Sequence, residues 1–160
     1  MKVLFLHGLE SKPGGTKAAY LESKGYEVLN PALPKTDFEE SIRIAQEVID
    51  QEQPNVIVGS SRGGAVAMGV NPCGASVVLI APGWRRFLNE EKIAEWNIRC
   101  EPSTTMILHS KNDDIIPLAD SEEIVRNHGV KLIEVGTGHR MSDTDALEAL
   151  HDVVKWLGGE

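Results

Sequence analysis

Cysteine is scarce in this sequence, whose 160 residues include two, Cys73 and Cys100. Small secreted domains rely on dense disulfide frameworks, and two single cysteines do not provide one. Their spacing also fits no metal-binding cysteine pair, and a His-Glu-x-x-His motif is absent. We therefore expect two reduced thiols, a cytoplasmic location, and neither a metal ion nor another cofactor.

Long apolar runs are missing as well. The longest, such as residues 75–82, are far shorter than the roughly 20 residues that cross a bilayer. The chain starts with a basic residue and an apolar stretch, as signal peptides do, but the stretch is confined to residues 3–6 and no small-residue cleavage site follows. We interpret this stretch as a first strand, and the length of the chain predicts one domain over residues 1–160.

Positive charge is in the minority, because 16 Lys and Arg residues stand against 24 Asp and Glu residues, for a net charge of -8. Nucleic acids and anionic membranes attract basic surfaces, so we expect neither as a partner. A small-molecule partner is the expectation that remains, and the composition leaves the oligomeric state open.

What the sequence does contain is a regular alternation of apolar runs and helical patterns. Strands that are continuously apolar belong to parallel sheets whose two faces are both covered. The sequence therefore predicts an α/β fold with a doubly wound, mainly parallel sheet. The expected strands are residues 3–6, 27–29, 56–58, 76–81, 105–108 and 131–135, and the expected helices are residues 16–24, 37–51, about 65–70 and 142–157.

Two helices have less regular sequence signals. The last one is expected to begin at Ser142, with Asp145 three residues later as a variant capping box. The other lies within residues 83–101, a segment too small for a domain, where large apolar side chains predict one short helix: Trp84, Phe87, Ile93 and Trp96.

A Gly-x-Ser-x-Gly motif, Gly59-Ser60-Ser61-Arg62-Gly63, lies between the third strand and the helix behind it. A serine at a sharp strand-to-helix turn has its neighbours two positions away pressed together, which leaves room for little beyond hydrogen. Ser61 has glycine at both of these positions, whereas Ser60 has Val58 and Arg62. Ser61 is therefore the candidate nucleophile of the motif.

A serine hydroxyl needs a base and a group that orients this base. The fifth expected strand is followed by Asp113 and Asp114, and the sixth is followed by Gly138-His139. Residues at the carboxyl ends of parallel strands lie on one rim of the sheet, where open α/β sheets bind their ligands. This placement makes His139 a candidate base beside Ser61.

At this point the chain resembles the α/β-hydrolase family over nearly its whole length. The matching features are a His7-Gly8 loop after the first strand, the Gly-x-Ser-x-Gly motif, an Asp shortly before Ile116-Pro117, and Gly-His after the last strand. The resemblance implies a minimal six-stranded sheet in the order 2-1-3-4-5-6. It also implies that Ser61 is the nucleophile, His139 the general base and then acid, and Asp113 the orienting carboxylate. The backbone N–H groups of Leu9 and Arg62 would form the oxyanion hole.

The function implied by this resemblance is that of a serine hydrolase that cleaves small carboxylic esters or thioesters through an acyl-enzyme. Two alternatives stay open: a non-catalytic binding protein on a hydrolase fold, and an acyltransferase or small amidase with the same triad. Because residues 83–101 are too few for the lid of many relatives, short acyl groups of roughly two to six carbons are expected.

Four residues are candidate substrate contacts: His7, Gly8, Glu10 and Trp84. The side chain of Arg62 has two possible roles, because it could pair with Glu10 or bind an anionic group of the substrate. We expect His7 to shape its loop rather than titrate. The other histidines, His109, His128 and His151, are expected to be structural or to face solvent.

Overall fold

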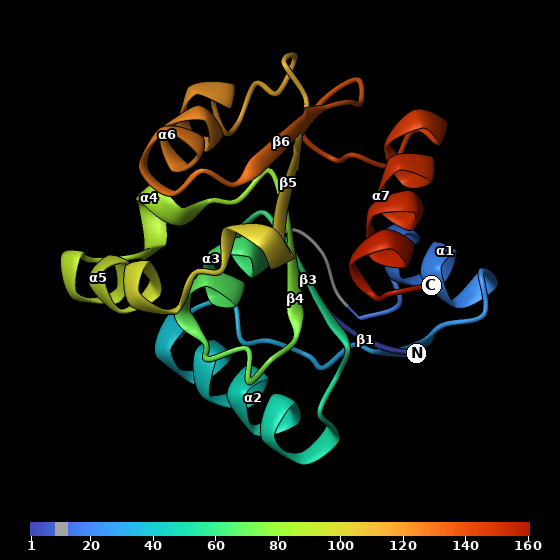
Figure 1. Ribbon diagram of the computed structural model, residues 1–160, viewed down its shortest axis with the longest axis horizontal. Helices are drawn as coiled ribbons and strands as arrows, with labels where there is room; N and C mark the ends of the chain where they lie inside the picture. The colour runs from blue at the N-terminus through green and yellow to red at the C-terminus, as the bar shows by residue number, and fades with distance from the viewer. Residues whose placement is uncertain (9–12) are drawn as a thin grey trace.

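A computed structural model describes residues 1–8 and 13–160 of the chain (Figure 1). Within these residues, six parallel strands form one sheet in the order β2-β1-β3-β4-β5-β6, which is the predicted order. The strands are β1 (Lys2–Leu6), β2 (Glu27–Leu29), β3 (Val56–Ser60), β4 (Ser76–Ile80), β5 (Thr105–His109) and β6 (Lys131–Glu134).

Burial explains which strands lie in the middle of the sheet. Every residue of β3, β4 and β5 is buried, as expected for apolar runs that are covered on both faces. The edge strand β6 instead begins and ends with exposed charged residues, Lys131 and Glu134. Charged ends of this kind protect a sheet edge against pairing with another chain.

The helices cover both faces of the sheet (Figure 1). α1 and α7 pack on one face, and α2, α3, α5 and α6 contribute to the core on the other face. Side chains along β1 alternate between these two cores, since Val3 and Phe5 face the first and Leu4 and Leu6 the second. The helices are α1 (Thr16–Ser23), α2 (Phe38–Glu52), α3 (Arg62–Gly69), α4 (Trp84–Phe87), α5 (Glu90–Arg99), α6 (Leu118–His128) and α7 (Thr144–Leu157), with a short 3-10 turn, η1 (Pro102–Thr104).

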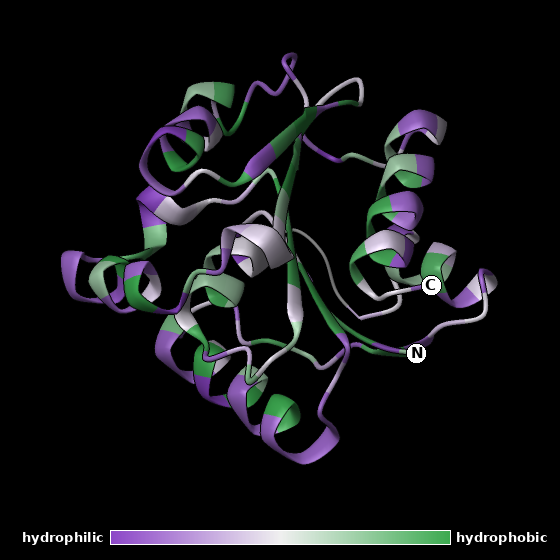
Figure 2. Ribbon diagram, viewed as in Figure 1, coloured by the Kyte–Doolittle hydropathy of each residue, from purple (hydrophilic) through white to green (hydrophobic). Residues whose placement is uncertain are grey.

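Hydropathy follows this arrangement. In Figure 2 the central strands are hydrophobic, and the hydrophilic residues gather on the helices and connecting loops. The amphipathic pattern of α2 buries Ile42, Ala45 and Ile49 and leaves its other face to solvent. Among the helices described, none is long and apolar enough to cross a membrane. Both cysteines, Cys73 and Cys100, are free thiols.

Three details differ from the sequence-based expectations. The sequence patterns gave no helix between the fifth and sixth strands, whereas α6 lies there. The segment 83–101 forms two helices, α4 and α5, instead of one. The last helix is capped by Asp143 and not by Ser142, because the Asp143 carboxylate accepts hydrogen bonds from the N–H groups of both Ala146 and Thr137.

Candidate active site

Ser61 occupies the turn between β3 and α3 in a conformation that is rare for a non-glycine residue, with φ 56° and ψ -114°. Four backbone hydrogen bonds hold it there. Its N–H donates to Ile80 O at 2.9 Å, and its carbonyl oxygen accepts from the N–H groups of Gly64 at 3.0 Å, Ala65 at 3.3 Å and Gly83 at 2.9 Å. The strain at Ser61 is therefore maintained by the ends of neighbouring elements.

The glycines of the motif are required by close backbone approaches. A Cβ atom on Gly59 would collide with the carbonyl group of Gly63, as expected from their positions two residues before and after Ser61. A Cβ atom on Gly63 would in turn collide with the carbonyl group of Leu6, at the end of β1. These contacts let α3 start directly against the rim of the sheet, and they fix the direction in which Ser61 leaves the turn.

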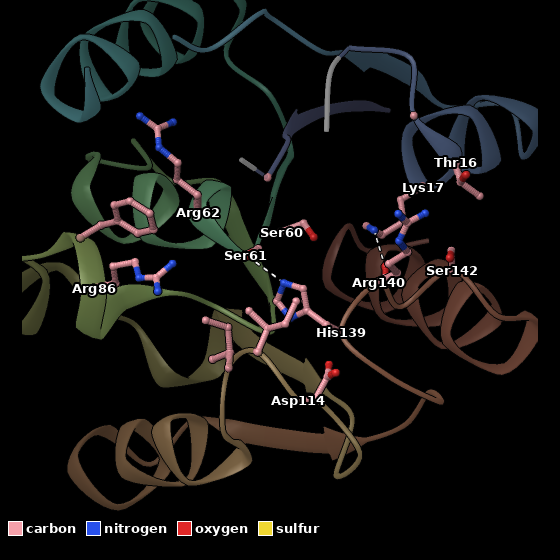
Figure 3. A pocket seen from close by; sticks show the side chains of 15 residues that line it. Thr16, Lys17, Ser60, Ser61, Arg62, Arg86, Asp114, His139, Arg140 and Ser142 are labelled. Atoms are coloured by element: carbon pink, nitrogen blue, oxygen red, sulfur yellow. Dashed lines mark hydrogen bonds between the residues drawn. The ribbon is translucent and has the colours of Figure 1, made fainter. Parts of the chain in front are cut away.

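Ser61, His139 and Asp113, predicted from three separate parts of the sequence, lie in one line of hydrogen bonds. Ser61 Oγ is 3.0 Å from His139 Nε2, and His139 Nδ1 is 2.7 Å from Asp113 Oδ2. Because the Asp113 carboxylate accepts, Nδ1 carries a proton and Nε2 is left to accept one from the Ser61 hydroxyl. Figure 3 shows His139 pointing toward Ser61.

The two adjacent acids, Asp113 and Asp114, differ in burial and in their contacts. The side chain of Asp113 is fully buried, and its Oδ1 accepts hydrogen bonds of 2.8 Å from the N–H groups of Ile115 and Ile116. Burial would raise the pKa of this carboxyl, but the hydrogen bonds from His139 and the two N–H groups outweigh it and hold the pKa below its usual value. Asp114 is exposed and borders the cavity instead.

His109 is part of this network, which the sequence did not reveal. Its ring is completely buried, with Nδ1 2.6 Å from Ser121 Oγ and Nε2 donating to Ile116 O at 2.9 Å. The same Nε2 lies 3.2 Å from Asp113 Oδ2, so two histidines approach one carboxylate oxygen. Of the two alternatives expected for His109, the structure therefore shows the structural one, and the spacing of four residues from Asp113 was the only available signal of its contact with that acid.

One of the two predicted donors of the oxyanion hole lies within the described residues. The N–H of Arg62 is the first of α3, and a helix leaves its first four N–H groups without an acceptor inside the helix. The second predicted donor, Leu9, lies outside the described residues, and so does Glu10. Gly8, directly before them, borders the cavity at Ser61.

Two candidate substrate contacts are occupied by other partners. His7 is buried, its Nδ1 donates to Gly8 O at 2.9 Å, and its Nε2 accepts from the N–H of Leu33 at 3.1 Å. Both nitrogens therefore serve the loop, and neither is available to a ligand. Trp84 donates from Nε1 to Asp120 O at 3.1 Å, which attaches α4 to α6 and directs the indole ring away from the cavity.

The side chain of Arg62 faces the core instead of a substrate. Its guanidinium donates to Pro34 O at 2.8 Å and to Ser41 Oγ at 3.1 Å, and it lies over the rings of Phe38 and Phe87. Burial lowers the pKa of this guanidinium, and the nearby charge of Asp37 opposes the shift. Figure 3 shows Arg62 directed away from His139, so its predicted alternative role as an anion contact is wrong. The other alternative, pairing with Glu10, falls outside the described residues.

A cavity of about 590 Å³ opens in front of Ser61 and His139. This volume is in the range of small-molecule sites. Its apolar wall comes from Phe87, Ile115 and Ile116. Among residues 1–8 and 13–160, no three His, Cys, Asp or Glu side chains gather as metal ligands would.

Comparison with protein-family models and with curated proteins finds no match for this chain. Solved structures do match. The esterase domain of a Rhodothermus marinus protein has a TM-score of 0.74 at 18% identity, covering 99% of this chain and 86% of that one. Paleococcus ferrophilus monoacylglycerol lipase has a TM-score of 0.74 at 16% identity, covering 99% and 94%. Alpha/beta hydrolase domain-containing protein 10 from mouse has a TM-score of 0.72 at 16% identity, covering 98% and 88%.

These similarities, together with the strand order, identify the fold. The chain has the α/β-hydrolase fold in a form with six parallel strands among its described residues. The fold predicted from the sequence is therefore confirmed.

Proposed function

We propose that this protein is a serine hydrolase that cleaves short-chain carboxylic esters or thioesters through an acyl-enzyme intermediate. One observation carries the proposal, namely the line of hydrogen bonds from Ser61 through His139 to the buried carboxylate of Asp113, with Ser61 at the mouth of a cavity. A hydroxyl that donates to an oriented imidazole is the arrangement that activates serine for attack on a carbonyl carbon.

The proposed reaction has two halves. In the first, Ser61 Oγ bonds to the carbonyl carbon while His139 Nε2 takes its proton, and the N–H groups of Arg62 and Leu9 stabilise the oxyanion. His139 then returns the proton to the leaving alcohol or thiol, which leaves an acyl group on Ser61. In the second half, water repeats the attack with the same proton transfers and releases the acid. The ionised Asp113 stabilises the positively charged imidazole in both halves.

The strain at Ser61 favours a catalyst over a binding protein on the same fold. The conformation of Ser61, with φ 56° and ψ -114°, costs on the order of 1–3 kcal/mol, and strain of this kind clusters at active sites. Here the unusual conformation directs Oγ at His139 Nε2. The esterase and the lipase among the structural neighbours support an ester substrate, and water as the acyl acceptor is the simplest choice.

The wall of the cavity favours short acyl groups. From the segment between β4 and β5, only Arg86 and Phe87 border the described cavity, whereas Trp84 packs toward α6 and Trp96 is buried in the core. Phe87 and Ile115 offer apolar surface for a few methylene groups. Further methylenes would remain in water and gain no binding free energy.

We also propose that His109 is a positioning residue. Its Nε2–H lies between Ile116 O and Asp113 Oδ2, and Ser121 fixes the other side of the ring. This contact restrains the carboxylate oxygen that accepts from His139. His109 therefore acts on the reaction through Asp113 and not by touching the substrate.

The nucleophile is tested by two neighbouring alanine variants. Ser61→Ala is expected to lower turnover of 4-nitrophenyl acetate by about 10³-fold or more, because binding and the oxyanion hole alone remain. Ser60→Ala serves as the matched control and is expected to keep most of the activity. Substantial activity in Ser61→Ala, or its loss in Ser60→Ala alone, would show that the nucleophile is a different residue.

The role of His109 is tested by a pair of variants. His109→Leu is expected to lower kcat about tenfold with little change in KM, since the carboxylate that orients His139 loses the ring nitrogen that lies 3.2 Å from its Oδ2. His109→Gln retains an N–H donor and is expected to recover most of kcat. Kinetics are measured well below the unfolding temperature of each variant. A kcat that does not respond to His109→Leu, or a glutamine variant no better than the leucine variant, would contradict a positioning role.

Substrate size is tested with 4-nitrophenyl esters of increasing acyl length. The value of kcat/KM is expected to peak between about two and six acyl carbons, because each exposed methylene forgoes about 0.8 kcal/mol of burial. A peak at about ten carbons or activation by emulsified lipid would show instead that residues 83–101 provide a long apolar site.

A further inference from the structure

The cavity at Ser61 has the opposite sign of charge from the chain as a whole. Its described lining includes three basic side chains that do not pack in the core, those of Lys17, Arg86 and Arg140. The acidic side chain in this lining is that of Asp114. The chain, by contrast, has 24 acidic residues and 16 basic ones. Figure 3 shows Lys17 and Arg140 together on one side of His139, with Arg86 on the other side in this view.

Lys17 and Arg140 are held next to each other by a specific contact. Lys17, in the first turn of α1, donates from Nζ to the backbone carbonyl oxygen of Arg140 at 2.6 Å. Burial and the charge of Arg140 lower the pKa of Lys17 to about 8. In the described part of the chain, no carboxylate lies within 4.0 Å of either cation. Two cations that repel each other are thus kept at the wall of the cavity that Ser61 also borders, and an anion placed between them would relieve this repulsion.

α4 carries two arginines, and they differ in their ion pairs. Arg85 pairs with Asp120 at 3.0 Å and with Glu123 at 2.9 Å, so it joins α4 to α6. Arg86 makes no ion pair within the described residues and borders the cavity. The basic surplus at the cavity is therefore separate from the charge pairs that stabilise the fold.

The position of Arg140 indicates which part of a substrate would carry the negative charge. In the proposed reaction His139 gives its proton to the leaving group, so the leaving group must lie against His139. Arg140 follows His139 directly in the chain, and Lys17 is hydrogen-bonded to the Arg140 carbonyl. The acyl part then faces the apolar side chains of Phe87 and Ile115.

We propose that Lys17 and Arg140 form an anion subsite for the leaving group, so that the substrate is a short acyl ester or thioester whose alcohol or thiol part carries a carboxylate or phosphate. This inference rests on the proposed hydrolase function and extends it to a substrate class. Guanidinium and ammonium groups both bind carboxylates and phosphates, so the subsite chemistry is common to the two anions.

The test compares two nearly isosteric esters, 4-acetoxybenzoate and its neutral methyl ester, together with 4-acetoxyphenyl phosphate. The wild-type protein is expected to favour the carboxylate over the methyl ester by about tenfold in kcat/KM, as two partly exposed cations can provide. The phosphate ester shows whether a phosphate is accepted better than a carboxylate. The preference is expected to shrink as the salt concentration rises.

Charge variants locate the subsite. Arg140→Gln and Lys17→Gln are each expected to lower the ratio of kcat/KM for the carboxylate over the methyl ester by about threefold, which is half of the wild-type preference in free energy. Arg126→Gln, an equal change of charge at an exposed site on α6, is the control and is expected to leave the ratio unchanged. If Arg86→Gln abolished the preference while the other two variants did not, the anion would bind at Arg86, and the assignment to the leaving-group side would be overturned.

A binding measurement separates failure of the subsite from failure of the hydrolase function. Calorimetric titration of Ser61→Ala with 4-acetoxybenzoate is expected to show binding that weakens about threefold when Arg140→Gln is added. Equal affinity for the acid and its methyl ester would overturn the anion subsite, whatever the activity. Charge-dependent binding without hydrolysis of any ester by the wild-type protein would instead uphold the subsite and overturn the proposed function.

Discussion

The close approach of α3 to the ends of β1 and β3 is the constraint on which the site depends. Gly63 has its α-carbon against the carbonyl of Leu6, and Gly59 against the carbonyl of Gly63, so a side chain at either position would push the helix away from the sheet. With these contacts in place, Ser61 is forced to a positive φ and its hydroxyl leaves the rim toward His139. The strain at Ser61 is thus compensated by the packing of the central strands.

The parallel sheet brings the remaining groups to this point. Because every strand runs in the same direction, the chain leaves β3, β5 and β6 on one rim, and the segments that follow carry Ser61, Asp113 and His139. The contacts of His109 extend this network inward to Ser121 on α6. Through His109, the orientation of the buried Asp113 carboxylate is linked to the packing of α6, a helix that does not border the cavity.

Much of the fold and the line of hydrogen bonds could be predicted because both are encoded in local patterns. Continuous apolar runs gave the strands, and the glycine positions distinguished Ser61 from Ser60. α6 was missed because Ser121 and Ile124 are its fully buried residues, which is too short an apolar stripe to detect. The roles of Leu9 and Glu10 stay predictions.

Other features depend on contacts between distant segments, which single-sequence patterns do not contain. Arg62 lies in the motif, yet its side chain is held by Pro34 and Ser41 and faces the core. Trp84 was expected at the cavity but is bound to α6. Lys17 and Arg140 are 123 positions apart in the sequence, and only the folded chain places them together.

The most direct test of the central claim, that the surroundings of Ser61 make its hydroxyl nucleophilic, is to locate the adduct of a fluorophosphonate probe by peptide mass spectrometry. A single phosphonylated residue, Ser61, is expected in the folded protein, and no labelling after the protein is unfolded in denaturant, because activation requires the hydrogen bond to His139. Labelling at another residue, or a folded protein that does not react, would contradict this claim.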